Sequence, residues 1–368
     1  MSINTEVIVV GGGAIGAACT RELARAGRRV LLIERGVDEG ASWRAAAGML
    51  APQIEAAEED PLFELAVAGR ERYVRLAEEL SASTGIDIQF WRSGIVRLAT
   101  GPGDLTPLKS RGHWQRQGGH AAEWLEANMV QARWPWLGAN LGALWVPEEA
   151  ALDPTSLVRA LLEDARLGGA AIQSDQVMSI ETRNDRVVAV IGANHRYSAE
   201  HVVIAAGAWT PAISGLPRPL PIVPVRGQMA SFPWPSGIER GIVFGSHVYV
   251  VARGAEAIVG STMEHAGFDP RVTDDGLASI CREAAELFPP LKGAQPTRAW
   301  AGLRPMSPDG RPILGGEPLC QGLWYATGHG RNGILLGAIT GLIIAQLING
   351  VDPGWGLRPM RPDRFFSW

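Results

Sequence analysis

The sequence predicts an α/β fold in which a parallel, Rossmann-like layer carries a second, α+β domain built on an antiparallel sheet. Two observations lead to this fold class. The chain begins with a strand, a Gly-rich turn, a helix and a second strand, and its region 217–300 contains short apolar runs separated by Gly and Pro. The length of 368 residues, 46% of them hydrophobic, is sufficient for two cores.

The first element is a β-branched run at residues 7–10, which meets the turn Gly-Gly-Gly-Ala-Ile-Gly at 11–16. Apolar residues then recur at helical spacing until Gly27. A second apolar run at 30–33 predicts a buried strand that ends in Glu34. This unit has the length that a right-handed parallel crossover requires, so we expect the parallel sheet to begin here.

The middle of the chain predicts a return to that sheet. Asp153 and Pro154 form a helix start, as N-cap and first helical residue, and runs at 186–191 and 202–206 read as strands. We expect residues 85–150 to leave the parallel layer and the chain to return to it here, an excursion from the first sheet. Short runs at 228–232, 248–252 and 257–259 alternate in part, which is typical of antiparallel strands.

These elements predict a discontinuous division of the chain. The expected segments of the cofactor domain are 1–84, 151–214 and 301–368, and those of the substrate domain are 85–150 and 215–300.

Composition excludes several function classes. A net charge of −4 gives no basic field for nucleic acid, so we expect no nucleic-acid partner. Three widely spaced cysteines form no disulfide framework or zinc motif, and no metal site is expected. The apolar stretch 333–348 is short and interrupted, so it predicts a buried helix and no membrane association, and a cytoplasmic location is the expectation.

The glycines at 11, 13 and 16 form a G-x-G-x-x-G pattern in its proper context. Gly11 permits the tight turn, Gly13 lets a pyrophosphate approach the backbone, and Gly16 lets helix and strand pack closely. Glu34 stands where a carboxylate can accept hydrogen bonds from ribose hydroxyls. The pattern predicts a dinucleotide site, but it does not by itself distinguish NAD from FAD.

Motifs spread over nearly the full length resemble the D-amino acid oxidase superfamily, and within it the glycine oxidases of thiamine biosynthesis. They are Ser42-Trp43-Arg44-Ala45-Ala46-Ala47-Gly48-Met49-Leu50, Val202-Val203-Ile204-Ala205-Ala206-Gly207-Ala208-Trp209, Trp300-Ala301-Gly302-Leu303-Arg304-Pro305 and Gly328-His329-Gly330-Arg331-Asn332-Gly333-Ile334. The resemblance implies an FAD-binding domain of the glutathione reductase type. The last motif also opens an apolar helix, whose free N–H groups suit a flavin carbonyl.

The glycine pattern and the resemblance together give a set of expected FAD-contacting residues. They are Gly11, Gly13, Ala14, Ile15, Gly16, Glu34, Arg35, Ser42, Ala46, Ala47, Gly48, Met49, Val177, Ala206, Gly207, Trp209, Arg304, His329, Gly330, Arg331, Asn332, Gly333 and Ile334.

The same resemblance implies the substrate site. Arg304 matches the family arginine that grips the substrate carboxylate, a task suited to a planar guanidinium, and a structural ion pair is its alternative. Tyr249 is the expected supporting donor. His247 shares a face with Tyr249 if strand alternation extends to it, and a packed strand residue is the alternative. Met263 is an apolar wall or plain core, and Arg331 is a charge near the cofactor or part of its turn.

The implied chemistry is hydride transfer from the Cα of a neutral amine to FAD, with oxygen then reduced to hydrogen peroxide and the imine hydrolysed. The flavin supplies the electron chemistry, so no side-chain base is required. Monomeric sarcosine oxidases place a lysine above a flavin tethered to cysteine. This sequence has Met263 in the comparable segment and no cysteine at the matching place, which favours the glycine oxidase branch with non-covalent FAD.

Several alternatives stay open at this stage. The substrate is glycine or a closely related amine, or an N-substituted glycine such as sarcosine or a larger, biosynthetic N-alkyl glycine, or a D-amino acid. The electron acceptor could be a quinone in place of oxygen. Two alternatives belong to other function classes: an FAD-binding structural or regulatory protein without catalytic turnover, and an NAD-dependent dehydrogenase. The resemblance implies a homotetramer.

Overall fold

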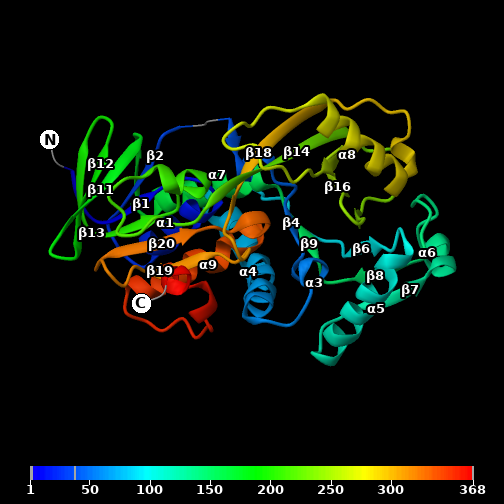
Figure 1. The fold of residues 1–368 in the computed structure, drawn as a ribbon, viewed down its shortest axis with the longest axis horizontal. Helices are drawn as coiled ribbons and strands as arrows, with labels where there is room; N and C mark the ends of the chain where they lie inside the picture. The colour runs from blue at the N-terminus through cyan, green and yellow to red at the C-terminus, as the bar shows by residue number, and fades with distance from the viewer. Residues whose placement is uncertain (1–2, 37–38, 367–368) are drawn as a thin grey trace.

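The protein is built around two large sheets that follow one another along its long axis (Figure 1). The computed structural model describes residues 3–36 and 39–366. The parts of the predicted domain segments at 1–2, 37–38 and 367–368 lie outside the described residues.

The first sheet contains the predicted parallel layer. Its strands run in the order β10-β2-β1-β13-β12-β11, and β20 pairs with β13 and β19. Their bounds are β1 Ile3–Val10, β2 Val30–Glu34, β10 Ala171–Ser174, β11 Val177–Arg183, β12 Arg186–Gly192, β13 Arg196–Ile204, β19 Ile313–Gly316 and β20 Leu323–Thr327. β1 pairs in parallel with both β2 and β13, which confirms that the chain returns to this sheet after the excursion.

Helices pack against this sheet and against one another. α1 (Ala14–Arg25) contacts α7 (Pro154–Leu167) and α9 (Gly333–Ile348), and α4 (Pro61–Thr84) packs on α7 and α9. Asp153 caps α7 as predicted, because its carboxylate accepts a hydrogen bond from the Ser156 N–H at 2.8 Å. α1 approaches α9 closely at Gly341, where an added Cβ would meet Ala18 backbone atoms at 2.6–2.7 Å.

The last of these helices is apolar throughout. With the preceding turn it spans Gly330–Ile348, which is long and apolar enough to cross a membrane by length and composition alone. However, 67% of its most apolar window is buried inside the protein. This is the behaviour expected of a core helix, and it agrees with the prediction for 333–348.

The second sheet is mainly antiparallel and runs in the order β3-β18-β14-β17-β16-β15-β6-β8-β7. Its strands are β3 Gly40–Ala41, β6 Ile95–Leu98, β7 Glu123–Glu126, β8 Gly142–Val146, β14 Val223–Pro233, β15 Ile242–Phe244, β16 Tyr249–Arg253, β17 Glu256–Gly260 and β18 Arg298–Met306. The excursion 85–150 supplies β6, β7 and β8, so it extends the sheet that the later strands begin.

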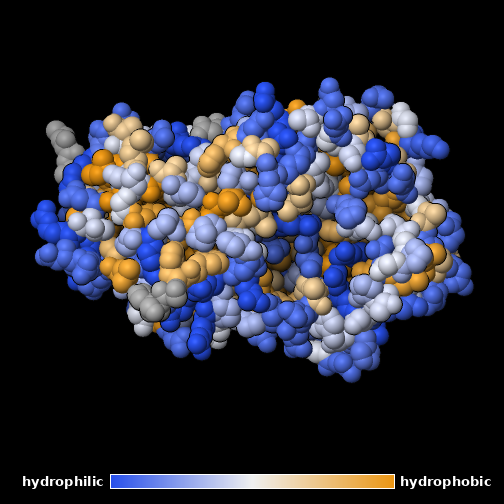
Figure 2. Space-filling view, viewed as in Figure 1, coloured by the Kyte–Doolittle hydropathy of each residue, from blue (hydrophilic) through white to orange (hydrophobic). Residues whose placement is uncertain are grey.

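Short elements connect the two sheets. A small sheet joins β4 (Met49–Leu50), β9 (Ala150–Ala151) and β5 (Trp91–Arg92). The remaining helices are α2 Ser42–Ala45, α3 Pro52–Glu55, α5 Pro102–Gln117, α6 Ala127–Arg133 and α8 Asp274–Leu287, and the 3-10 turns are η1 Gly207–Ala212, η2 Pro289–Leu291, η3 Gly330–Asn332, η4 Arg358–Met360 and η5 Pro362–Phe365. On the face in Figure 2 the outline is largely hydrophilic, and apolar side chains form several patches set in from it.

Two details differ from the sequence expectations. β18 pairs with β14 from Arg298 to Met306, so the expected domain boundary at 300/301 cuts through a strand of the second sheet. β16 begins at Tyr249, and His247 lies in the bend after β15. The alternation argument for His247 was therefore wrong, because a residue in a hairpin bend does not follow the period of the strand.

Candidate functional site

Two adjoining cavities run between the Gly-rich turn and the second sheet. The outer cavity encloses about 1540 Å³ and the inner one about 1140 Å³ of space that no atom fills, open solvent at their mouths included. They share the residues Gly13, Ser42, Trp43, Ala205 and Gly207 in their walls. The two cavities therefore form one elongated channel.

The glycines of the N-terminal turn shape the start of this channel. Gly11 has a φ of +102°, and a Cβ there would lie 2.6 Å from the Ala205 carbonyl oxygen. A Cβ on Gly16 would lie 1.7 Å from the Gly11 oxygen. Gly13 is the N-cap of α1 and provides no side-chain cap, so the first N–H groups of the helix are available to an anion.

Glu34 closes the outer end of the turn. Its carboxylate accepts hydrogen bonds from the N–H groups of Gly12 at 2.5 Å and Gly36 at 3.2 Å, and it lines the outer cavity. Beside it, the Arg35 guanidinium stacks on the Trp209 ring at 4.1 Å. These side chains give the outer cavity a carboxylate and a flat aromatic wall, which suit the sugar and base of a nucleotide.

A second helix N-terminus opens into the inner cavity. Asn332 is the N-cap of α9 and makes no side-chain cap, and the turn 329–333 lines the cavity. His329 is 2% exposed, and burial lowers its pKa to about 3, so the ring is neutral. Its Nε2 lies 3.1 Å from Thr340 Oγ1, a contact that ties the turn to α9.

These features fit FAD. The outer cavity offers space for a nucleotide and the inner cavity for a planar ring, and an uncapped helix N-terminus lines each part of the channel. The close approach at Gly11 and Gly16 leaves room only for backbone, so the pyrophosphate would meet N–H groups directly.

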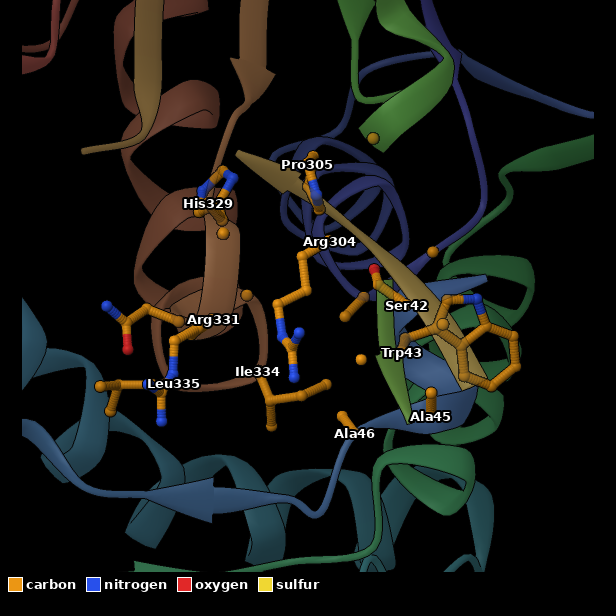
Figure 3. Close-up of a pocket in the computed structure, with 18 of the residues that line it drawn as sticks. Ser42, Trp43, Ala45, Ala46, Arg304, Pro305, His329, Arg331, Ile334 and Leu335 are labelled. Atoms are coloured by element: carbon orange, nitrogen blue, oxygen red, sulfur yellow. The ribbon is translucent and has the colours of Figure 1, made fainter. Parts of the chain in front are cut away.

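Arg304, on β18, enters the inner cavity from the second sheet (Figure 3). Its Nη2 donates to Ser261 Oγ at 2.6 Å and its Nη1 to the Thr262 carbonyl at 3.1 Å. No carboxylate of the described residues pairs with it, so the predicted alternative of a structural ion pair has no partner in this part of the chain. Burial lowers the pKa of the guanidinium, and the nearby charge of Arg331 acts in the same direction. An anionic ligand would relieve both effects.

Tyr249 and Met229 form an apolar wall of the same cavity. Both are buried, and the Tyr249 hydroxyl lies 3.5 Å from the Met229 sulfur. A Cβ on Gly260 would lie 2.2 Å from that sulfur, so the two side chains fill the space that the glycine leaves. The wall thus limits the size of a ligand held by Arg304.

A third wall comes from the short helix α3. Its residue Glu55 accepts a hydrogen bond from Arg331 Nη2 at 2.9 Å, and both residues line the inner cavity. The helix is held from behind, because Glu149 accepts from the Gln53 N–H at 2.7 Å and Arg70 donates to Gln53 Oε1 at 2.8 Å. Burial raises the pKa of Glu149 to about 8, although Arg70 opposes this shift.

The structure brings most of the predicted site residues into this channel. Those in its walls are Gly11, Gly13, Ala14, Ile15, Glu34, Arg35, Ser42, Ala46, Ala47, Gly48, Met49, Val177, Ala206, Gly207, Trp209, Tyr249, Arg304, His329, Gly330, Arg331, Asn332, Gly333 and Ile334. Gly16 lies beneath the turn and supports it. His247 and Met263 are exposed and line neither cavity.

Sequence reasoning missed other wall residues. Gly227, Met229, Ser261 and Glu55 line the inner cavity, and Trp43 lines both. Trp43 stood within a motif that the resemblance had already marked. Met229 lies on the predicted strand 228–232, so a face argument could have found it, whereas Gly227 lies just outside that range. Among residues 3–36 and 39–366, no group of three or more His, Cys, Asp or Glu side chains could hold a metal ion.

Comparison with known proteins gives a consistent picture. A family model described as FAD dependent oxidoreductase matches residues 6–347. A glycine oxidase from Geobacillus kaustophilus is 34% identical over 98% of this chain and 97% of the relative, and its crystal structure superposes with a TM-score of 0.94 over 100% of both chains.

Two further proteins are informative. A bifunctional ThiO/ThiG protein from Synechocystis is 33% identical over 100% of this chain and 55% of the relative. The crystal structure of iminodiacetate oxidase from Chelativorans sp. BNC1 is 27% identical, with a TM-score of 0.89 over 97% of this chain and 99% of that one.

Proposed function

Because this chain belongs to the family of FAD-dependent oxidoreductases, we propose that it oxidises glycine or a closely related small amine. The overall reaction converts the amino acid, oxygen and water into a 2-oxo acid, ammonia (or an alkylamine) and hydrogen peroxide. The observation that carries the proposal is Arg304, a guanidinium without a carboxylate partner among the described residues, at the inner end of a dinucleotide channel. The glycine oxidase relatives support this substrate class.

Bound FAD supplies the hydride acceptor for the substrate Cα–H. The glycine turn at 11–16 would hold its pyrophosphate, Glu34 its ribose hydroxyls and the N–H groups at 330–334 its pyrimidine edge. Each of these assignments rests on position in the channel and on the family pattern.

Arg304 binds the substrate carboxylate through its planar fork of donors, and Tyr249 assists from β16 of the same sheet. This fixes the substrate at one end, so that its Cα faces the turn 330–334 across the cavity. Met229 and Tyr249 exclude water and bulky side chains on that side. The substrate amine has to be neutral to release hydride. Among the described residues that line the inner cavity, His329 is the one histidine and there is no lysine. His329 is buried and its Nε2 already contacts Thr340, so it is not placed to act as a base for the amine.

N-substituted glycines are a second candidate class. The likeness to iminodiacetate oxidase supports it, since that protein's name describes a substrate with the amine nitrogen between two carboxymethyl groups. D-amino acids remain the alternative in which the substituent lies on Cα. A thiamine-pathway role is the biosynthetic context that we propose from the resemblance and from the ThiO/ThiG relative.

A single experiment tests this function. Purified yellow protein is mixed without oxygen with glycine, sarcosine, N-ethylglycine, D-alanine or D-proline, and loss of flavin absorbance is followed. Admission of air should then yield hydrogen peroxide. Bleaching by none of these amines would contradict the proposal, and bleaching without peroxide would indicate a dehydrogenase that uses another acceptor.

We also propose a cytoplasmic homotetramer, as the resemblance implies. Light scattering tests the assembly: a mass near that of the 39.3 kDa chain would refute it.

A further inference from the structure

Two arginines of the inner cavity differ in how their charge is used. Arg304 has no carboxylate partner among the described residues, whereas Arg331 donates one hydrogen bond to Glu55. That bond uses only Nη2, and no other hydrogen bond of Arg331 is found in the described part of the chain. A guanidinium has several N–H donors, so most of those on Arg331 are available to a ligand. Both side chains extend in the same direction across the cavity (Figure 3).

Two further arginines lie near the carboxylate beside Arg331. Arg97 on β6 donates to the Ile54 carbonyl at 2.8 Å, and Arg111 on α5 donates to the same oxygen. Neither arginine has a carboxylate within 4.0 Å among the described residues, and Arg111 Nε is buried without a hydrogen-bond partner. Glu55 pairs with Arg331 and attracts Arg97 and Arg111 only at longer range, so this one carboxylate interacts with three guanidinium groups.

A second acid near this cluster does not balance its charge. Asp104 attracts Arg97 and accepts hydrogen bonds from the N–H of Gly101 and the hydroxyls of Thr100 and Ser246, but Glu55 and Asp104 are then two carboxylates beside three guanidinium groups. Burial and the charge of Arg97 lower the pKa of Arg111 to about 10, so it stays protonated at neutral pH. Once a substrate carboxylate has paired with Arg304, this side of the cavity still carries excess positive charge.

We propose that the substrate is a small amino dicarboxylate, whose second carboxylate binds Arg331 while the carboxylate next to the reacting carbon binds Arg304. The inference rests on the proposed function and narrows its substrate class. The oxidised bond and the electron balance stay the same, because the second carboxylate takes no part in hydride transfer. It accepts charge-assisted hydrogen bonds from an arginine that lines the cavity and uses one of its donors on Glu55. It also offsets the repulsion among the clustered guanidinium groups.

Pairs of substrates that are alike except for the charge of the second carboxylate measure the effect of that charge on catalysis. Iminodiacetate carries it on the nitrogen substituent, and N-(carbamoylmethyl)glycine is its neutral amide of nearly equal size. D-aspartate carries it on Cα, and D-asparagine is the corresponding amide. We expect kcat/KM of at least one dicarboxylate to exceed that of its amide by about tenfold or more. The pair that shows the preference identifies where the second carboxylate is attached.

Variants then assign the preference to Arg331. In Arg331→Met the ratio of dicarboxylate to amide should fall to within about twofold of one, and Arg331→Lys should restore part of it. Arg75→Met removes an equal charge from an exposed site on α4 and serves as the control, in which the ratio should be retained. A ratio near one in the parent protein, or a ratio that Arg331→Met leaves unchanged, would overturn the proposal.

A binding measurement separates this proposal from the proposed function. Diglycolate has the shape of iminodiacetate but an ether oxygen in place of the amine, so it cannot be oxidised in the same way, and methoxyacetate lacks its second carboxylate. Their dissociation constants follow from perturbation of the flavin absorbance. Tighter binding of diglycolate that depends on Arg331 supports the subsite even if no amine bleaches the flavin. Bleaching by sarcosine with equal binding of the two ethers would refute the subsite and leave the proposed function intact.

Discussion

Arg304 lies directly against the backbone of Gly227, which is two residues beyond its pairing partner Val225 on β14. A Cβ at position 227 would lie 2.2 Å from Arg304 Nη2 and 2.3 Å from Nη1. The absence of a side chain on one strand therefore creates the space for a guanidinium that belongs to the next. The position of the proposed carboxylate anchor depends on a residue with no functional group.

Gly227→Ala tests this dependence. The added methyl group should displace Arg304 and raise KM for glycine by about tenfold or more, with the bound flavin retained. Steady-state kinetics and the ratio of flavin to protein measure the two effects. Gly103→Ala is the control, because that exposed helical glycine has no atom within 4 Å of an added Cβ. Equal kinetics in both variants would show that Arg304 has room elsewhere.

Arg304→Ala should weaken glycine binding more strongly, by about a hundredfold or more in kcat/KM, because a charge-assisted, two-point contact is lost. Arg304→Lys should recover little, since a single ammonium cannot reproduce the planar fork. The flavin spectrum provides the control for folding. An unchanged KM in Arg304→Ala would mean that the arginine is structural.

Glu34→Ala should weaken FAD binding by roughly tenfold, because the acceptor expected for the ribose hydroxyls is removed from the end of β2. Flavin fluorescence during dialysis or titration of the apoprotein gives the dissociation constant. KM for glycine, measured with saturating FAD, should change far less, since Glu34 lines only the outer cavity. A reverse pattern, with KM affected and FAD affinity intact, would contradict the assignment of the two ends of the channel.

Glu149 makes stability depend on pH in a specific direction. Its pKa is raised from 4.5 to about 8 in the folded protein, so between these values the folded state holds a proton that the unfolded state has lost. The contribution of the Glu149 carboxyl to the free energy of unfolding is complete below about pH 4.5, and it declines as the pH rises towards 8. Glu149→Gln keeps the site neutral, so its stability relative to the parent should increase from pH 5 to pH 8. Urea unfolding midpoints at both pH values test this, and a constant difference would show that Glu149 is ionised throughout.

FAD should be held without a covalent bond. None of the three cysteines lines either cavity, and Cys19 and Cys320 are buried elsewhere. Precipitation with acid should leave the flavin in the supernatant, as its absorbance would show. Yellow colour that stays with the precipitated chain would contradict this, and peptide mapping would then locate the attachment.

The sequence was sufficient for the layer architecture and for most of the channel. The β-turn-α-β unit is local, so hydrophobic period and glycine spacing determine it, and the late motifs added the turn at 328–334. Residues whose role depends on two distant strands were not predictable. Gly227 carries no chemical signal of its own, and Glu55 joins the cavity only because α3 is held by Gln53, Glu149 and Arg70.

His247 and Met263 show the limit of transferring site positions from a family resemblance, supported for His247 by strand alternation. Their neighbours Tyr249 and Ser261 line the cavity, but both residues lie beyond the ends of their strands. Where a strand ends is decided by pairing with its neighbours, and a short sequence pattern locates such ends only to within a few residues.

The channel is assembled from segments that are far apart in the sequence, from Val10 to Leu335. During synthesis on a ribosome, the turn at 11–16 emerges well before the wall formed by β18 and the N-terminus of α9. A nascent chain that has not yet reached residue 335 therefore offers only part of the site. FAD that binds the assembled channel stabilises the folded form by mass action.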